Sequence, residues 1–308
     1  IRATPQWTLM AQDAFNGVEL WHRPLSDWFP HIVGWTTAPT ELERRLVAIG
    51  DRVYVTLGLH APVSVLDAAT GKTLSELENT AGTEEIIWHK GTLLLSTRTV
   101  TPEKISQKEL WKQLVTQDNS PAYNRDTAGD VVQRLKSAEA GGDEAILAFD
   151  TSTGHLLWKK DGADVSRLKT TTLSAGGDRV FYQAKGDVVC LDLKSGKNLW
   201  TVSAPTMRIM SGDTIYCADN ETIVALSAET GKARWTQPSS LVQIKDLFVA
   251  GGALWEGGFQ PAPGKRSPVW GAYFVSQRNL ATGEILRRLE PENPGHHHRC
   301  YENKATDR

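Results

Sequence analysis

One nine-residue phrase occurs six times in this sequence, and its recurrence limits the available folds more than any other feature. The phrase opens with Asp, Asn or Ser, has Gly in fifth place and, in four copies, ends in Trp. The copies are DAFNGVELW (13–21), DAATGKTLS (67–75), DTSTGHLLW (150–158), DLKSGKNLW (192–200), SAETGKARW (227–235) and NLATGEILR (279–287). Because one short unit recurs along the chain, we expect an architecture built from repeats.

The phrase is typical of a tight β-hairpin. The opening Asp, Asn or Ser accepts hydrogen bonds from backbone N–H groups two or three residues further on, and the Gly takes the positive φ of a type I turn with a G1 bulge. Short apolar runs precede the turns, such as 63–67 and 188–192, and we expect strands buried on both faces there. Two further β-rich runs lie upstream, so each unit is predicted to be a four-stranded antiparallel meander.

The spacing of the copies favours radial repetition. Consecutive glycines of the phrase are 54, 83, 42, 35 and 52 residues apart, and the two shortest distances approach a minimal propeller blade. A solenoid would need shorter, more uniform repeats, and a sandwich has no reason to repeat one hairpin six times. The predicted fold class is therefore all-β, a β-propeller of four-stranded antiparallel blades, with residues 1–308 as a single domain.

The two ends leave the number of blades open. Residues 6–17 are predicted to begin with a third strand, so the first blade lacks two strands, and residues 296–308 are predicted to contain the first strand of another blade. The ends could meet in a composite blade and give six blades. Alternatively, the chain is part of a longer protein with seven or eight blades, which the charged end 302–308 favours.

The phrase resembles the tryptophan-docking motif of the pyrroloquinoline quinone (PQQ) repeat family of quinoprotein-type propellers, A-x-D-x-x-T-G-x-x-x-W. MAQDAFNGVELW, LAFDTSTGHLLW and CLDLKSGKNLW match it closely. The resemblance implies that the phrase tryptophans pack between adjacent blades near the outer strands, a structural role, and that the phrase glycines serve the same blade docking. These residues are Trp21, Trp158, Trp200 and Trp235, with Gly17, Gly71, Gly154, Gly196, Gly231 and Gly283.

The resemblance alone does not imply catalysis, because the repeat builds blades and other residues hold the cofactor. Quinoprotein dehydrogenases of this family carry a vicinal cysteine pair, acidic and Asn ligands to calcium, and often a CxxCH haem site. This sequence has no CxxCH, and its three cysteines, Cys190, Cys217 and Cys300, are far apart. We predict a non-catalytic scaffold that binds a protein partner and needs no cofactor. The alternative is a divergent quinoprotein oxidoreductase with PQQ and calcium in the central channel.

Charge and hydropathy exclude some classes of binding partner. The chain has 34 Lys and Arg against 36 Asp and Glu, so it offers no basic field for nucleic acid. No apolar run approaches the roughly 18 residues of a spanning helix, so no direct membrane insertion is expected. By resemblance we expect a periplasmic or envelope-associated protein. A small ligand in the central channel is an alternative to the protein partner.

Two insertions are predicted. Residues 101–143 carry apolar side chains at three- and four-residue steps, which predicts two amphipathic helices within one blade, either as a cover for the propeller edge or as a docking element. Residues 256–272 are predicted to form a long loop, rich in Gly, Pro and aromatics. If this loop binds a ligand, Trp270 with Lys265 and Arg266 would suit an anionic or sugar-like molecule; otherwise it is a plain surface loop.

The last candidate is the sequence GHHHRC at 295–300. On a strand, His296, His298 and Cys300 would share one face and His297 and Arg299 the other. Two imidazoles and a thiol form part of a zinc or copper ligand set, so these residues are candidate metal ligands, and His296, His298 and Arg299 are candidate ligand-binding residues. A polar channel lining or a packing role is the alternative.

Overall fold

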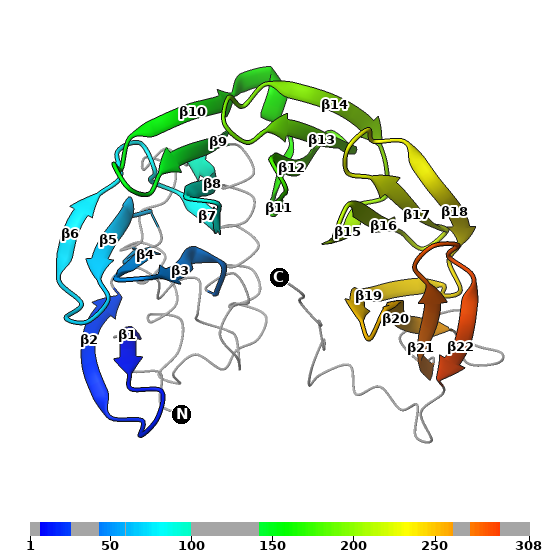
Figure 1. The fold of residues 1–308 in the computed structure, drawn as a ribbon, viewed down its shortest axis with the longest axis horizontal. Coiled ribbons are helices and arrows are strands. Elements are labelled where there is room, and N and C mark those ends of the chain that lie inside the picture. Colours follow the sequence, from blue (N-terminus) through cyan, green and yellow to red (C-terminus); the bar gives the residue numbers. More distant parts are fainter. Residues whose placement is uncertain (1–6, 26–42, 59, 100–141, 261–271, 290–308) are drawn as a thin grey trace, which may run out of the picture. The chain divides into compact units, whose positions relative to one another are not determined.

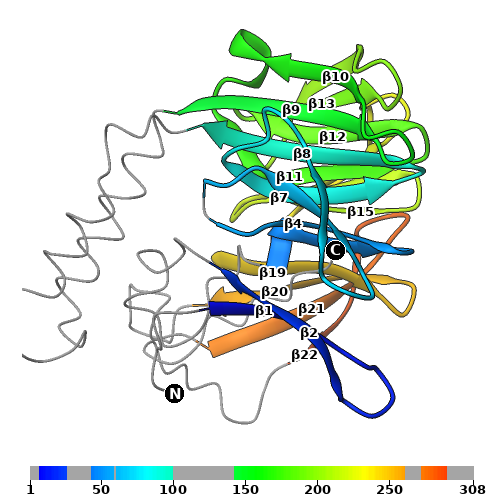
Figure 2. The same ribbon diagram turned by 90° about the vertical axis from the view of Figure 1, so that its left-hand side faces the viewer.

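The computed structural model describes residues 7–25, 43–58, 60–99, 142–260 and 272–289. Within these ranges the chain forms antiparallel β-sheets, one of two strands and five of four strands (Figure 1). In every four-stranded sheet the strands lie side by side in chain order or its reverse, as the β7–β10 sheet shows in Figure 2. The predicted four-stranded meander is therefore confirmed, and the first phrase, as expected, belongs to an incomplete sheet of two strands.

The chain divides into two compact units, the first of residues 1–173 with 194–196 and the second of 174–193 with 197–308. In its described residues, the first unit holds the two-stranded sheet, two complete four-stranded sheets and two short 3-10 turns. Its elements are β1 (Trp7–Gln12), β2 (Glu19–Leu25), η1 (Glu43–Arg45), β3 (Leu46–Ile49), β4 (Arg52–Thr56), β5 (Val63–Asp67), β6 (Thr73–Glu76), β7 (Thr83–His89), β8 (Thr92–Thr99), β9 (Asp143–Asp150), β10 (Leu156–Asp161) and η3 (Gly162–Val165).

The remaining strands form three four-stranded sheets, and β11 crosses from the first unit into the second along the sequence. They are β11 (Leu168–Gly176), β12 (Arg179–Ala184), β13 (Asp187–Asp192), β14 (Asn198–Ser203), β15 (Met207–Ser211), β16 (Thr214–Ala218), β17 (Thr222–Ser227), β18 (Ala233–Pro238), β19 (Gln243–Ala250), β20 (Ala253–Gln260), β21 (Ala272–Asn279) and β22 (Ile285–Leu289). No helix in the described ranges is long and apolar enough to cross a membrane.

Within each of the two units, the hydrophobic core lies between the faces of consecutive sheets. The third strands are buried on both faces, as predicted: Val63–Leu66, Val188–Leu191 and Ile223–Leu226 are all buried. In the second unit, Tyr216 and Ile223 of one sheet pack with Leu247 and Leu254 of the next. Within each unit, consecutive sheets therefore stabilise one another through apolar side chains on their faces.

Both predicted insertions have narrower limits than expected. Asp143 already pairs with Thr99 as part of β9, so the predicted helices fall within residues 100–141, outside the described residues. The predicted loop 256–272 is wrong at its edges, because β20 runs to Gln260 and β21 begins at Ala272. Residues 261–271 between them lie outside the described part of the chain.

Burial explains why the strand continues past residue 256. Glu256 is fully buried and pairs with Arg278 of β21 at 2.7 Å. Phe259 is 6% exposed, and its ring meets Tyr273 edge-on at 5.1 Å. These cross-strand contacts hold 256–260 in the sheet, although the local Gly and Pro content suggested a loop.

Candidate functional site

The six phrases form the turns between the third and fourth strands of their sheets, or between β1 and β2 in the first copy. In the third copy Asp150 Oδ1 accepts hydrogen bonds from the backbone N–H groups of Ser152 and Thr153, both at 2.9 Å. Gly154 has a φ of +75°, which a residue with a side chain rarely adopts. The hydroxyl of Ser152 and the N–H of Thr153 lower the pKa of Asp150 to about 2. The turn therefore favours an ionised carboxylate.

Each phrase Trp lies against the turn glycine of the next copy. A methyl group on Gly231 would lie 2.8 Å from Cε3 of Trp200, and one on Gly283 would lie 2.5 Å from Cε3 of Trp235. Trp21 and Trp158 lie in the same way against Gly71 and Gly196. A side chain larger than hydrogen would displace the indole ring in all four places.

The indole N–H groups anchor these contacts. Trp21 Nε1 donates to the carbonyl of Ala68 at 2.8 Å, and Trp235 Nε1 donates to that of Leu280 at 2.9 Å. Both acceptors lie three residues before the turn glycine. Trp200 Nε1 donates to the carbonyls of Ala228 and Glu229 at 3.3 and 3.1 Å. The stacking and the hydrogen bonds together join consecutive sheets at their outer strands.

The second copy has Ser75 in place of Trp, and other side chains take over part of its role. The space above Gly154 is open, since no atom of the described residues lies within 4 Å of the position that a methyl group on Gly154 would take. The carbonyl of Thr151, three residues before Gly154, accepts instead from Arg52 Nη1 at 3.0 Å and from the Tyr54 hydroxyl at 3.5 Å. A hydrogen bond to the same turn position is kept, while the ring contact is lost.

A β-bulge follows every turn, and the bulged residue is always the third after the glycine. Pairing passes from the second to the fourth residue after each glycine and leaves out the one between them. Five of the six bulged residues are leucine, and the exception is Arg234. They are 46–57% exposed: Leu20, Leu74, Leu157, Leu199 and Leu286. We call these five residues the bulge leucines.

The bulge leucines form the candidate functional site. A bulged residue is left out of the ladder of backbone hydrogen bonds, and the five bulge leucines are exposed. Buried apolar side chains dominate the inner strands. Packing in the core therefore does not explain why leucine recurs at one exposed position. What they can do chemically is pack against an apolar surface of another molecule.

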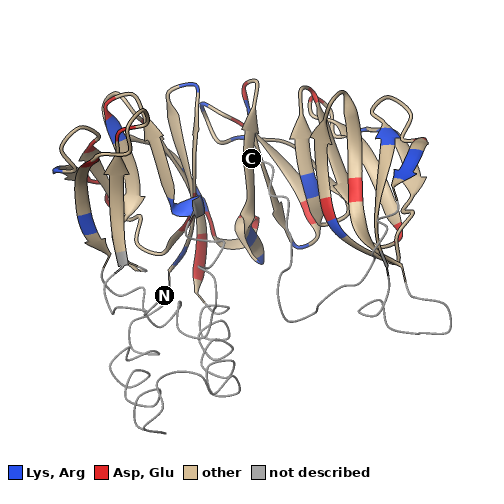
Figure 3. Ribbon diagram, turned by 90° about the horizontal axis from the view of Figure 1, so that it is seen from below, with Lys and Arg blue, Asp and Glu red and all other residues tan. Residues whose placement is uncertain are grey.

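Charges of both signs are interspersed on the described strands (Figure 3). Arg234 pairs with Asp213 at 2.6 Å, and hydrogen bonds from Arg234 and Thr214 lower the pKa of this carboxylate. Lys159 pairs with Asp161 on the exposed strand β10 at 2.8 Å. Such exposed pairs add little stability and provide no single-sign field.

A denser ionic network lies where β8 and β9 meet the segment 100–141. Arg98 lies 3.3 Å from Glu144 and 3.7 Å from Glu84. Glu85, whose side chain is 5% exposed, pairs with Arg44 at 2.7 Å. The partly buried pair of Arg98 with Glu144 therefore links the ends of β8 and β9 from which the segment departs.

The candidate ligand and metal residues named from the sequence do not fall in the described ranges. Lys265, Arg266 and Trp270 lie within 261–271, and His296, His298, Arg299 and Cys300 lie within 290–308. Among the residues that are described, no group of three or more His, Cys, Asp and Glu is placed to hold a metal ion. The proposed ligand sites therefore remain predictions.

The two described cysteines are buried in the core. Cys190 and Cys217 are fully buried thiols on β13 and β16, and burial raises the pKa of each to about 12. A vicinal disulfide needs cysteines adjacent in sequence, and the chain has none. Burial and a raised pKa are typical of unreactive structural thiols.

The repeat geometry has a counterpart among known proteins. The family model described as outer membrane protein assembly factor BamB matches residues 59–211 and 184–258, more than half of the chain. The chain belongs to the PQQ-repeat β-propeller family. The resemblance of the nine-residue phrase to the PQQ repeat is thereby confirmed, and so is the predicted propeller fold class.

Solved structures agree on the fold of this PQQ-repeat protein. BamB from Moraxella catarrhalis is similar with a TM-score of 0.52 at 16% identity, over 93% of this chain and 69% of that one. A quinohemoprotein alcohol dehydrogenase from Pseudomonas putida HK5 has a TM-score of 0.50 at 9% identity, over 93% of this chain and 58% of its own. A comparison with curated protein sequences finds no significant match. Identities this low support the fold and not the function.

Sequence reasoning missed the bulge leucines and the Arg52–Tyr54 substitute. A signal for the leucines was present, because Leu stands third after Gly in five of the six copies. Their exposure was not evident, since it depends on the bulge that moves this position out of the ladder. The role of Arg52 and Tyr54 could not be recognised in the sequence, because they lie in a different strand from Ser75, which stands where the other copies have Trp.

Proposed function

We propose that this chain is a non-catalytic protein-interaction scaffold whose outer strands bind an apolar partner surface through the bulge leucines. The observation that carries the proposal is their repetition: the same bulged position holds an exposed leucine in five of six copies. A single exposed leucine is ordinary on a protein surface and needs no explanation. Recurrence at one register position, outside the core, supports a shared contact role.

The bulge also indicates how the partner is held. The fourth strands β6, β10, β14, β18 and β22 lie at an edge of their sheets. An edge strand can pair with a strand from another chain, but a bulge twists the edge and breaks the row of hydrogen-bonding groups. We therefore infer that the partner packs on side chains rather than extending the sheet.

The family match supports the finer parts of the proposal. The matched family is described as an outer membrane protein assembly factor, so we infer an envelope-associated, periplasmic protein. We also infer that the chain works without PQQ or calcium, because its sequence has no vicinal cysteines. An oxidation of an alcohol or sugar by the purified chain that requires PQQ would contradict this proposal.

Photo-crosslinking at neighbouring residues tests the contact. Leu156 and Leu157 are 48% and 46% exposed on the same strand, but only Leu157 is bulged. A photoreactive phenylalanine derivative at position 157 should yield an adduct of one discrete mass in envelope fractions, and the same group at 156 should not. Equal adduct yields at positions 156 and 157 would contradict the proposed site. The absence of an adduct at all of positions 20, 74 and 157 would also contradict it.

A second matched pair gives an independent check. Ile285 is 47% exposed and paired, whereas Leu286 is 57% exposed and bulged. Once the adduct partner is identified, Leu286→Ser should weaken its binding to the purified chain more than Ile285→Ser does. Both variants change only an exposed side chain, so thermal unfolding should be almost unaffected.

A further inference from the structure

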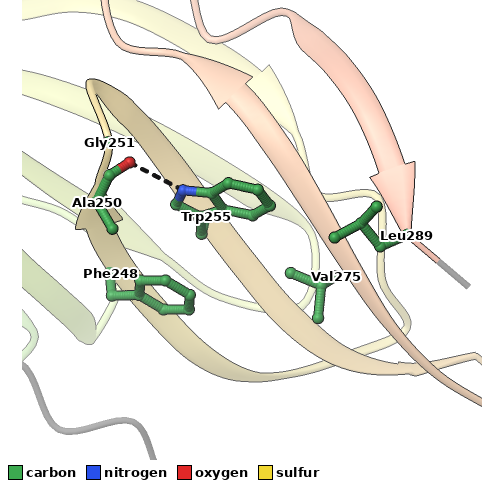
Figure 4. A pocket seen from close by; sticks show the side chains of 6 residues that line it. All are labelled: Phe248, Ala250, Gly251, Trp255, Val275 and Leu289. Carbon is green, nitrogen blue, oxygen red and sulfur yellow. Dashed lines mark hydrogen bonds between the residues drawn. The ribbon is translucent and has the colours of Figure 1, made fainter. Parts of the chain in front are cut away.

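The sheet β19–β22 has an apolar hollow on one face. Its volume is about 410 Å³, and Figure 4 shows the side chains around it. It is lined by Phe248, Ala250, Gly251, Trp255, Val275 and Leu289. The rings of Phe248 and Trp255 stack at 6.2 Å with an interplanar angle of 7°. Among the described residues no polar side chain lines the hollow, so water molecules in it would find few hydrogen-bond partners.

The preceding sheet shows what this face is built to receive. When the sheets β15–β18 and β19–β22 are aligned on Gly231 and Gly283, three lining residues have direct counterparts. Phe248 corresponds to Ile209, Trp255 to Tyr216, and Val275 to Ile223. All three counterparts belong to the core between the two sheets. The lining residues therefore occupy positions that, one sheet earlier, are covered by the strands that follow in the chain.

The chain provides the first of those covering strands soon after each outer strand. After β18 ends at Pro238, β19 begins at Gln243, and its Ile244 and Leu247 enter the shared core. After β22 ends at Leu289, itself a lining residue, residues 290–308 follow. By the same spacing from Gly283, a strand corresponding to β19 would start near residue 295.

Two carboxylates follow the arginines of β22 directly in the chain. Arg287 lies over the ring of Trp255 at 5.6 Å, and Arg288 lies over Phe274 at 4.1 Å. The segment that follows begins with Glu290 and Glu292, whereas residues 295–302 hold Arg299 as well as Glu302 and add no net charge. Carboxylates close to exposed guanidinium groups favour the approach of this segment to the sheet.

We propose that residues 295–302 bind along this hollow as a further strand, with the ring of Tyr301 against Trp255 and Phe248. Tyr301 is the largest apolar side chain in 290–308, and aromatic rings pack favourably on one another. Since side chains alternate along a strand, His298 and Cys300 then lie on the face opposite Tyr301. The hollow is thus an intramolecular docking site for the end of the given sequence.

A fluorophore on Cys300 tests the proposal in the full chain. Cys190 and Cys217 are buried, so bimane should label Cys300 selectively. Tryptophan quenches bimane only at close range. Trp255→Phe should at least double the bimane emission, whereas Trp88→Phe, at a 38% exposed residue of another sheet, should leave it unchanged. Emission that is the same in Trp255→Phe and in the parent chain would overturn the proposal.

Tyr301→Ala provides a variant that leaves every described strand intact. It should release the bimane quenching, and in unlabelled protein it should speed the reaction of Cys300 with a disulfide reagent. The quenching should not change when the protein is diluted. Quenching that disappears on dilution would assign the hollow to a second copy of the chain, and quenching that is insensitive to Tyr301→Ala would assign it to another occupant; either result overturns the proposal.

Discussion

Two turn glycines with almost the same φ angle allow the contribution of a docked indole to stability to be measured. Gly231 and Gly154 have φ values of +70° and +75°, but Trp200 covers only Gly231. An alanine at either position should cost about 1–2 kcal/mol for its left-handed backbone. At 231 the methyl group must also displace the ring, which adds about 1–3 kcal/mol.

Urea unfolding of Gly231→Ala and Gly154→Ala measures this difference directly. We expect Gly231→Ala to lose more of the free energy of unfolding. Equal losses would mean that the indole contact contributes nothing to the join between the sheets.

Asp150 gives the same turn a pH dependence. Its pKa is lowered from the ordinary value of 3.8 to about 2, chiefly by the hydroxyl of Ser152 and the N–H of Thr153. A group whose pKa is lower in the folded chain stabilises it above the unfolded value, and this contribution disappears as the pH falls through the folded value.

The thermal midpoint of the parent chain should therefore fall between about pH 4 and pH 2 more steeply than that of Asp150→Asn. Asp51→Asn serves as the control, since its side chain is 91% exposed. If Asp150→Asn and the parent chain have parallel profiles over this range, the carboxylate does not stabilise the turn.

At the scale of the elements, the interface between β3–β6 and β7–β10 differs from those that contain a phrase Trp. Ser75 leaves the space over Gly154 open, while Arg52 and Tyr54 bind the Thr151 carbonyl. Ser75→Trp should place a ring in that space and raise the free energy of unfolding by about 0.5–2 kcal/mol, the usual gain from filling a gap.

Denaturant unfolding of Ser75→Trp measures the gain, with Ser75→Leu as the control for added apolar area alone. A loss of stability in Ser75→Trp would show that Arg52 already occupies the position of the indole. The open space would then be a consequence of the polar contact and not a gap.

Most of these elements could be predicted from the sequence, because their signals are local. A hairpin depends on residues within nine positions, so six similar phrases predicted six turns and the strands beside them. The exposure of Leu157 could not be predicted, since it depends on a bulge in the pairing of β9 with β10. The burial of Phe259 was missed because its partner Tyr273 comes from the following strand and the local composition indicated a loop.

At the scale of the whole molecule, the fold is compatible with a scaffold and with a quinoprotein. A titration with PQQ and calcium distinguishes the two. A scaffold of the proposed kind should not bind PQQ, with or without calcium. Its tryptophan fluorescence should stay constant when both are added, and native mass spectrometry should show no adduct. A stoichiometric quinone adduct would instead support the divergent quinoprotein and direct attention to the residues outside the described ranges.

The pairing of Thr99 with Asp143 affects how this protein can evolve. The segment between them leaves and rejoins one hairpin at two residues that already face each other, and the Arg98 network holds those strand ends. Loop closure costs depend only weakly on length, so the hairpin tolerates segments of very different size. Selection can thus shorten, lengthen or replace residues 100–141 without disturbing a single strand register, which makes this a position where relatives of one scaffold can diverge at low cost in stability.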